Sequence, residues 1–179
     1  MNSHTFMVQC FQLMATELRE GCVAEVKEFE KSIEKIKQGL RETIVVSKVA
    51  ESNCDGEEET LARIQKVRNL AIKSAMTEIK LLKKKIELSK YMYRMCDPNR
   101  GDLVVRSNGG LGGLSNEEID GHHKIVDEIQ ELNREMIEVF EEEQELGIGT
   151  EGKYLKDMNV MKKEFEKHEF VRIPESFRS

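Results

Sequence analysis

The chain has 179 residues and a net charge of −6, and 35% of its residues are charged while only 6% are aromatic. A thick globular core is hard to build from this composition, which is typical of coiled coils and long helices. The only prolines are Pro98 and Pro174, so residues 1–97 and 99–173 lack the strongest helix breaker. The sequence therefore predicts an all-α protein of long amphipathic helices.

Several absences bear on where the protein works. No apolar run approaches the roughly 20 residues that span a bilayer, and the first residues lack the basic start of a secretory signal. The four cysteines are scattered and form no CxxC pair, which argues against a zinc knuckle or a thioredoxin-type motif. We expect an intracellular protein, cytoplasmic or nuclear, that contacts membranes only peripherally if at all.

The first expected helix covers about residues 6–50. Its apolar residues alternate at spacings of three and four, which predicts a seam that packs against another helix. Gly21 and Gly39 each weaken the helix by roughly 1 kcal/mol relative to Ala but do not oblige it to end. The predicted seam on this helix consists of Val26, Phe29, Ile33, Ile36 and Leu40.

A turn in residues 52–60 separates this helix from a second one at about 57–96. Asn53, Asp55 and Gly56 favour a turn, so residues 1–97 are expected to form an antiparallel hairpin; one bent, continuous helix is the alternative. The apolar face of the second helix is wide enough to contact more than one neighbour. Its predicted seam consists of Ile79, Leu82, Ile86 and Tyr93.

Residues 98–115 contain five glycines and are expected to form a flexible linker. Ser115 and Glu118 have the spacing of a capping box at the start of a third helix. The C-terminal part, 116–179, is predicted to hold this helix, a short final helix at about 153–170 and a tail. The predicted seam of the third helix includes Ile129, Met136 and Phe140. The whole is an extended antiparallel helical bundle or coiled coil with four main helices.

Charge is strongly partitioned between the second and third helices. Residues 61–96 hold ten basic and two acidic residues, a net of +8, whereas residues 116–151 hold thirteen acidic and two basic residues, a net of −11. Charges that flank an apolar seam set partner choice and orientation in coiled coils. We therefore interpret the partition as a code for helix pairing, within one chain or between chains.

The alternative is that the basic run from Lys80 to Lys90 binds nucleic acid or anionic lipid. The candidate anion contacts are Lys80, Lys83, Lys84 and Lys85. Three of them are consecutive and fan around the helix, and the run lacks the companions that a nucleic-acid surface usually offers. Nucleic acid is the disfavoured partner.

No catalytic, cofactor or metal site is predicted. His122 and His123 are adjacent, but the chain has no Glu-x-x-His motif of the kind a di-iron bundle requires, and exposed histidines in a polar first turn are the preferred interpretation. The glycines of the linker lack the GK[ST] of a phosphate-binding loop.

These observations favour a non-enzymatic coiled-coil scaffold or adaptor in a multi-protein complex. Its expected partners are other helical proteins, a second copy of the chain, or both. A SNARE-like membrane-traffic bundle is a further hypothesis, because Gln144 within an acidic heptad-like stretch is similar to the pairing helix of that family. Gly147, Gly149 and Gly152 interrupt this helix, and no anchor segment follows it in the sequence.

Overall fold

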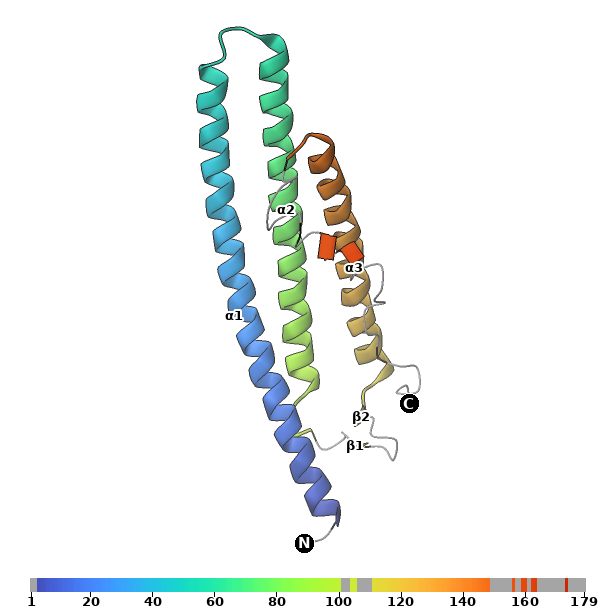
Figure 1. The fold of residues 1–179 in the computed structure, drawn as a ribbon. Helices are drawn as coiled ribbons and strands as arrows, with labels where there is room; N and C mark the ends of the chain where they lie inside the picture. The colour runs from blue at the N-terminus through green and yellow to red at the C-terminus, as the bar shows by residue number, and fades with distance from the viewer. Residues whose placement is uncertain are drawn as a thin grey trace. The chain divides into compact units, whose positions relative to one another are not determined.

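The computed structural model describes residues 3–100, 104–105, 111–148, 156, 159–160, 162–163 and 173. Helix α1 covers Ser3–Ser52, α2 covers Glu58–Met95 and α3 covers Asn116–Glu145 (Figure 1). The protein is all-α, as the composition predicts. Within the described residues, no helix is both long and apolar enough to cross a membrane.

Helix α1 runs without interruption through both of its interior glycines and through the β-branched run 43–46. The Thr43 hydroxyl donates a hydrogen bond to the Gly39 carbonyl at 2.9 Å. The Thr16 hydroxyl donates an equivalent bond to the Gln12 carbonyl at 2.8 Å. The helix can thus accommodate threonine by bonding its side chain to the preceding turn.

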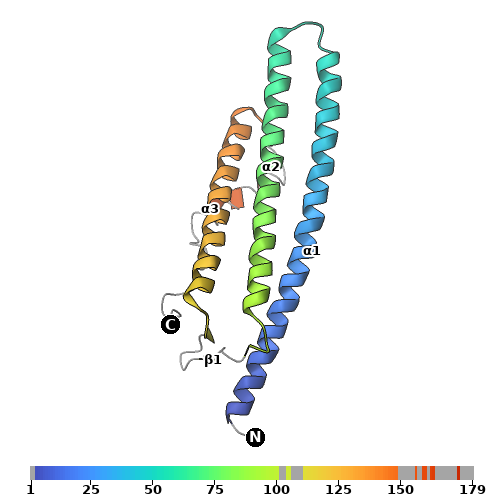
Figure 2. The ribbon, with the colours of Figure 1, turned by 180° about the vertical axis from the view of Figure 1, so that it is seen from behind.

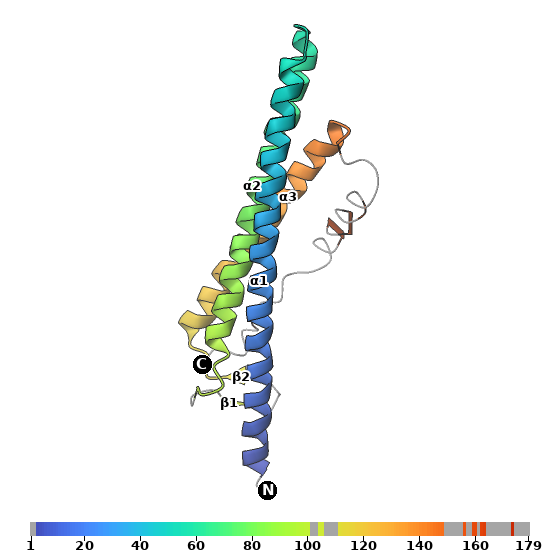
Figure 3. The same cartoon turned by 90° about the vertical axis from the view of Figure 1, so that its left-hand side faces the viewer.

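The chain reverses direction between α1 and α2 in a short turn (Figures 1 and 3). The Asn53 amide bonds to the Val49 carbonyl at 3.1 Å, and Gly56 has a φ of 81°, a conformation that favours glycine. Glu58 and Glu59 occupy the first turn of α2, where their charge complements the positive end of the helix dipole.

The chain divides into two compact units that cut across the helices. Unit 1 comprises Met1–Glu30, Lys83–Ile129 and Phe170–Ser179, and unit 2 comprises Lys31–Leu82 and Gln130–Glu169. Each unit therefore contains a segment of α1, a segment of α2 and a segment of α3. The sequence-based division at residues 98–115 stays a prediction about which parts fold independently.

In unit 1, the end of α2 packs beside the start of α3 (Figure 2). The buried residues Met95, Leu114 and Ile119 form a core, against which Tyr91, Met92 and Ile173 pack. The Tyr91 hydroxyl donates a hydrogen bond to the Glu118 carbonyl at 2.8 Å. This bond ties the last turns of α2 to the first turn of α3.

The predicted capping box at the start of α3 is confirmed. The Glu118 amide donates to Ser115 Oγ at 3.2 Å, and the Ser115 amide donates to Glu118 Oε2 at 2.8 Å. Arg100 adds hydrogen bonds to both carboxylate oxygens of Glu118, at 2.5 and 3.0 Å. Arg100 and then the Ser115 bonds hold the pKa of Glu118 below its usual range.

The segment expected to be a flexible linker contains one small regular element. Strand β1, Val104–Val105, pairs antiparallel with β2, Leu111–Gly112. Consecutive valines favour extended backbone, but the five glycines of residues 98–115 are the stronger signal in the sequence and favour a flexible linker.

In unit 2, α3 ends in a glycine cap. Gly147 has a φ of 73°, its amide bonds to the Gln144 carbonyl at 3.0 Å, and the Ile148 amide bonds to the Glu143 carbonyl at 2.8 Å. This pair of bonds is a Schellman motif, which satisfies carbonyls that the helix itself leaves free. The buried apolar residues of unit 2 are Ile33, Leu70, Ile79, Leu81, Met136, Val139 and Phe140.

The described residues contain three long helices, where four main helices were expected. Most of the expected final helix at 153–170 lies outside the described residues, although residues 156, 159–160 and 162–163 are helical.

Candidate partner-binding groove

The predicted seams differ in how completely the fold buries them. All three seam residues named on α3 are buried, whereas on α1 only Ile33 is buried, and on α2 only Ile79. The remaining predicted seam residues are half-buried: Val26, Phe29, Ile36 and Leu40 on α1, with Leu82, Ile86 and Tyr93 on α2. The seams of α1 and α2 thus keep apolar surface that no described residue covers.

The opposite charges of α2 and α3 meet within the chain. In unit 1, Lys84 pairs with Glu128 at 2.5 Å, and in unit 2, Lys73 pairs with Glu142 at 2.5 Å. Hydrogen bonds to Glu128 and then Glu87 raise the pKa of Lys84. These contacts are what the pairing code predicts for α3 folded back on α2, and they order the register more than they stabilise the fold.

The four candidate anion contacts do not share one surface role. Lys84 forms ion pairs with Glu128 and Glu87. Lys85 is half-buried and also interacts with another residue. Lys80 and Lys83 are exposed. Of the four, only Lys83 lines a groove described below.

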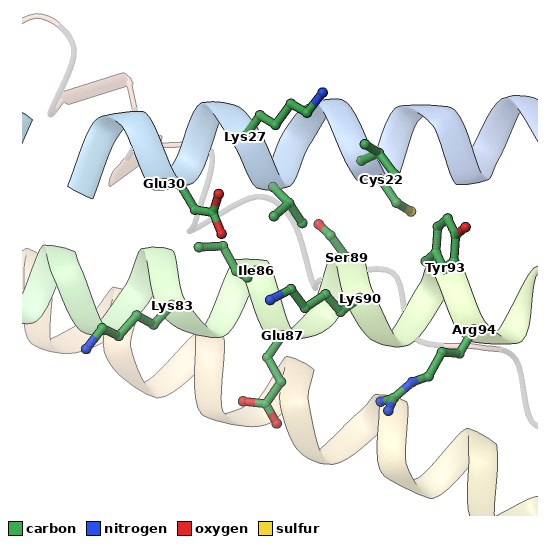
Figure 4. A pocket seen from close by; sticks show the side chains of 12 residues that line it. Cys22, Lys27, Glu30, Lys83, Ile86, Glu87, Ser89, Lys90, Tyr93 and Arg94 are labelled. Carbon is green, nitrogen blue, oxygen red and sulfur yellow. The ribbon is translucent and has the colours of Figure 1, made fainter. Parts of the chain in front are cut away.

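A groove of about 800 Å³ lies in unit 1 between α1 and α2 (Figure 4). We call it the unit 1 groove. Its apolar lining comes from both helices: Cys22, Val23 and Val26 on α1, with Ile86 and Tyr93 on α2. Its remaining lining residues are polar or charged: Lys27, Glu30, Lys83, Glu87, Ser89, Lys90 and Arg94.

Polar contacts between α1 and α2 fix the walls of this groove. The Ser89 hydroxyl donates to Glu25 Oε2 at 2.9 Å. Arg19 stacks over the Tyr93 ring, 4.0 Å from its centroid, and its guanidinium lies 3.5 Å from Asp97 Oδ1. These three contacts join α1 to α2 beside the groove and fix the register of the two helices there.

The thiol in the groove is not activated. Burial raises the pKa of Cys22, and Glu25 and Cys96 raise it further. A thiol of this kind stays protonated at neutral pH and behaves as a small apolar group. All four cysteines are free, and Cys96 is buried.

The rim of the unit 1 groove carries unpaired positive charge. Within the described part of the chain, Lys27, Lys83 and Lys90 are exposed and form no ion pair. Two carboxylates also line the groove: Glu87, which shares the Lys84 ammonium with Glu128, and Glu30, which forms no ion pair among the described residues. Four basic side chains and two carboxylates give the lining a net positive charge. Arg94 lies over the Tyr91 ring, 5.4 Å from its centroid.

The basic side chains of this rim have a partial signal in the sequence. Lys83, Lys90 and Arg94 are spaced by seven and four residues, which places them on one side of a helix. The consecutive lysines at 83–85 drew attention to a fan instead. The contribution of Lys27 could not be found without knowing the register of α1 against α2.

A second, smaller groove of about 640 Å³ lies in unit 2, also between α1 and α2. Val46, which lines it, is 67% exposed. One of its two arginines, Arg68, is already paired with Glu51 at 2.6 Å.

The histidine pair is placed differently from the expectation of two exposed side chains. His122 is buried, and its Nδ1 has no hydrogen-bond partner among the residues that the structure describes, so that expectation was wrong for this residue. It lies on the inward face of α3 with Ile119 and Val126, three and four residues away. Burial, and then His123, lower the pKa of His122. Among the described residues, no three His, Cys, Asp or Glu side chains are grouped so that they could hold a metal ion.

Comparisons with protein-family models, with curated proteins and with solved structures find no match to this chain.

Proposed function

We propose that this protein is a non-enzymatic interaction subunit, a coiled-coil scaffold or adaptor that joins other helical proteins by charge-matched helix pairing. The observation that carries the proposal is the exposed apolar surface of α1. In unit 1, Leu13 and Met14 are 66% and 62% exposed, and in unit 2, Val45 and Val46 are 61% and 67% exposed. Clustered exposed apolar side chains of this kind mark interaction sites in soluble proteins.

The proposal includes a fourth helix at 153–170 and coiled-coil packing of the seams. It places the protein in the cytoplasm or nucleus, which the four free thiols support, because disulfides are rare in those compartments. Partners are a second copy, another helical protein, or both.

Light scattering of the purified full chain tests the proposal, together with capture of partners from a native extract. The comparison variant carries Leu13→Ser, Met14→Ser, Val45→Ser and Val46→Ser, which alter only exposed side chains. We expect either a mass above the 20.7 kDa of one chain or a stoichiometric complex, and we expect the variant to lose it while keeping its circular dichroism spectrum. The proposal would be contradicted if the wild-type protein is a monomer and captures the same proteins as the variant.

The alternative function is binding of anionic lipid or nucleic acid through the basic run of α2, in which Lys80 and Lys83 are exposed. Binding to anionic vesicles or DNA that persists at physiological salt would favour the lipid or nucleic-acid hypothesis over helix pairing.

A further inference from the structure

The unit 1 groove has a shape into which a further helix could pack. Its two walls are antiparallel helical segments, Cys22–Glu30 of α1 and Lys83–Arg94 of α2, as Figure 4 shows. Side chains of neighbouring helices leave grooves into which the ridges of a further helix pack. Val23 is 44% exposed there, so a helix that packed into the groove would remove apolar surface from water.

The charges on the rim say what kind of helix fits. The free lysines Lys27, Lys83 and Lys90 come from both walls, whereas Glu30 is the one carboxylate on the rim without an ion pair in the described residues. A helix with basic flanks would bring like charges together, which costs free energy and suppresses the wrong partner.

The chain already contains a helix of the right kind on a different face of α2. Helix α3 packs its buried apolar residues inward while Glu128 meets Lys84. Lys84 and Lys83 are adjacent in sequence and so point about 100° apart around α2. The packing of α3 shows that a basic face of α2 accepts an acidic amphipathic helix, and Lys83, on another face of α2, is exposed.

From these observations we infer that the unit 1 groove binds an amphipathic helix of a partner protein, with an apolar stripe flanked by Asp and Glu residues. The inference rests on the proposed function and specifies the partner for this one site.

A second copy of the chain fits the groove less well. Mutual exchange about a two-fold axis places the same patch of both copies face to face. The unit 1 groove would then meet its own rim, and the lysines Lys27, Lys83 and Lys90 of the two copies would be brought together. Like charges brought together in this way cost free energy.

The inference is tested with a fluorescent synthetic peptide of about 21 residues, long enough to form a helix on binding. The peptide carries Leu and Ile at seam positions and Glu at the flanking positions, and a matched peptide carries Lys in place of Glu. Fluorescence anisotropy measures the affinity of each for the full-length protein. We expect the acidic peptide to bind at least about tenfold more tightly than the basic one.

Charge reversal on the protein provides the decisive comparison. The double variant Lys83→Glu, Lys90→Glu is expected to lose at least about tenfold in affinity for the acidic peptide and to gain affinity for the basic one. The matched control reverses Lys35 and Lys80, which are also exposed but do not line the groove, and it should bind like the wild type. Circular dichroism confirms that both variants are folded.

Other outcomes would overturn the inference. Equal affinity for the two peptides, or an affinity unchanged by Lys83→Glu, Lys90→Glu, would show that the groove does not select acidic helices. If the wild type is a homodimer and the double variant is a monomer, the occupant of the groove is a second copy. If the lysines are needed for binding to anionic vesicles and no peptide binds, the groove contacts a membrane surface instead. If a natural partner is captured equally by the wild type and the double variant, the proposed function survives while this inference fails.

Discussion

Helices α1 and α3 make opposite use of similar amphipathic patterns. On α3, Ile119, Ile129 and Val139 have no exposed surface, while acidic side chains take the outer face. On α1, most of the seam is half-buried, and large apolar residues such as Val46 face solvent. The difference is one of packing: the apolar residues of α3 are buried within the chain, whereas α1 keeps apolar side chains exposed among the described residues.

The comparison predicts the largest difference for apolar truncation. Ile129→Ala on α3 should lower the free energy of unfolding by about 2–5 kcal/mol, because it leaves a cavity at a fully buried site. Val46→Ala on α1 should change it by no more than about 0.5 kcal/mol, as is usual for surface substitutions. Urea denaturation of both variants measures this, and equal losses would break the distinction between the two helices.

Glycine substitutions should give effects of opposite sign in the two helices. A Cβ added to Gly121 of α3 would lie 2.9 Å from Tyr91 Cζ, closer than real side chains allow, so Gly121→Ala should cost about 1–3 kcal/mol. Gly21 of α1 has no such neighbour within 4 Å, so Gly21→Ala should stabilise the protein by about 0.5–1 kcal/mol. Thermal denaturation detects both effects.

The Gly121 effect has an internal check. The atom nearest to a Cβ at position 121 is the Tyr91 hydroxyl oxygen. Replacing Tyr91 by Phe in the Gly121→Ala background removes this atom, so a double-mutant cycle should show coupling between the two positions. Additive effects would mean that the close approach of Tyr91 to Gly121 is not what requires a glycine.

Acid should destabilise the protein through His122 of α3, by less than the substitutions above. Because the pKa of His122 is below its ordinary value of 6.5 in the folded protein, the unfolded chain binds a proton at higher pH than the folded one. The free energy of unfolding should fall as the pH drops from about 6.5 towards the folded pKa, and then level off. His122→Leu should flatten this dependence in denaturation measured across that range; an unchanged slope would assign it to other groups.

The smallest expected effect belongs to the ion pairs that join α2 to α3. A double-mutant cycle on Lys84→Met and Glu128→Gln should give a coupling of about 0.2–1 kcal/mol, and added salt should reduce it. A coupling several times larger would mean that charge pairing holds α3 in place, rather than the burial of its apolar seam.

Much of the fold could be predicted from the sequence, because the signals for helices are local. The first two helices were expected at 6–50 and 57–96 and are observed at Ser3–Ser52 and Glu58–Met95. The capping box at Ser115 was predicted from two residues and is present. The burial of His122 could not be predicted in this way, because a histidine among polar residues reveals its surroundings only once the inward face of α3 is known.

The candidate site was predictable in part. The seam residues Val26, Ile86 and Tyr93, and the basic residue Lys83, were named in advance, and the groove brings them together. Lys90 was named only as the end of the basic run, and Lys27 was not named. A groove between two helices depends on their register, which here involves Arg19 with Tyr93 and Ser89 with Glu25.

The sequence by itself determined that this protein is built from long amphipathic helices and that a basic helix is followed by an acidic one. Helix formation and charge are properties of short segments, so spacing and composition are enough to establish them. The tertiary structure alone decided which apolar seams are buried and which keep exposed surface. Burial depends on what packs against a face, and it left α3 covered while α1 and the basic edge of α2 form an open groove.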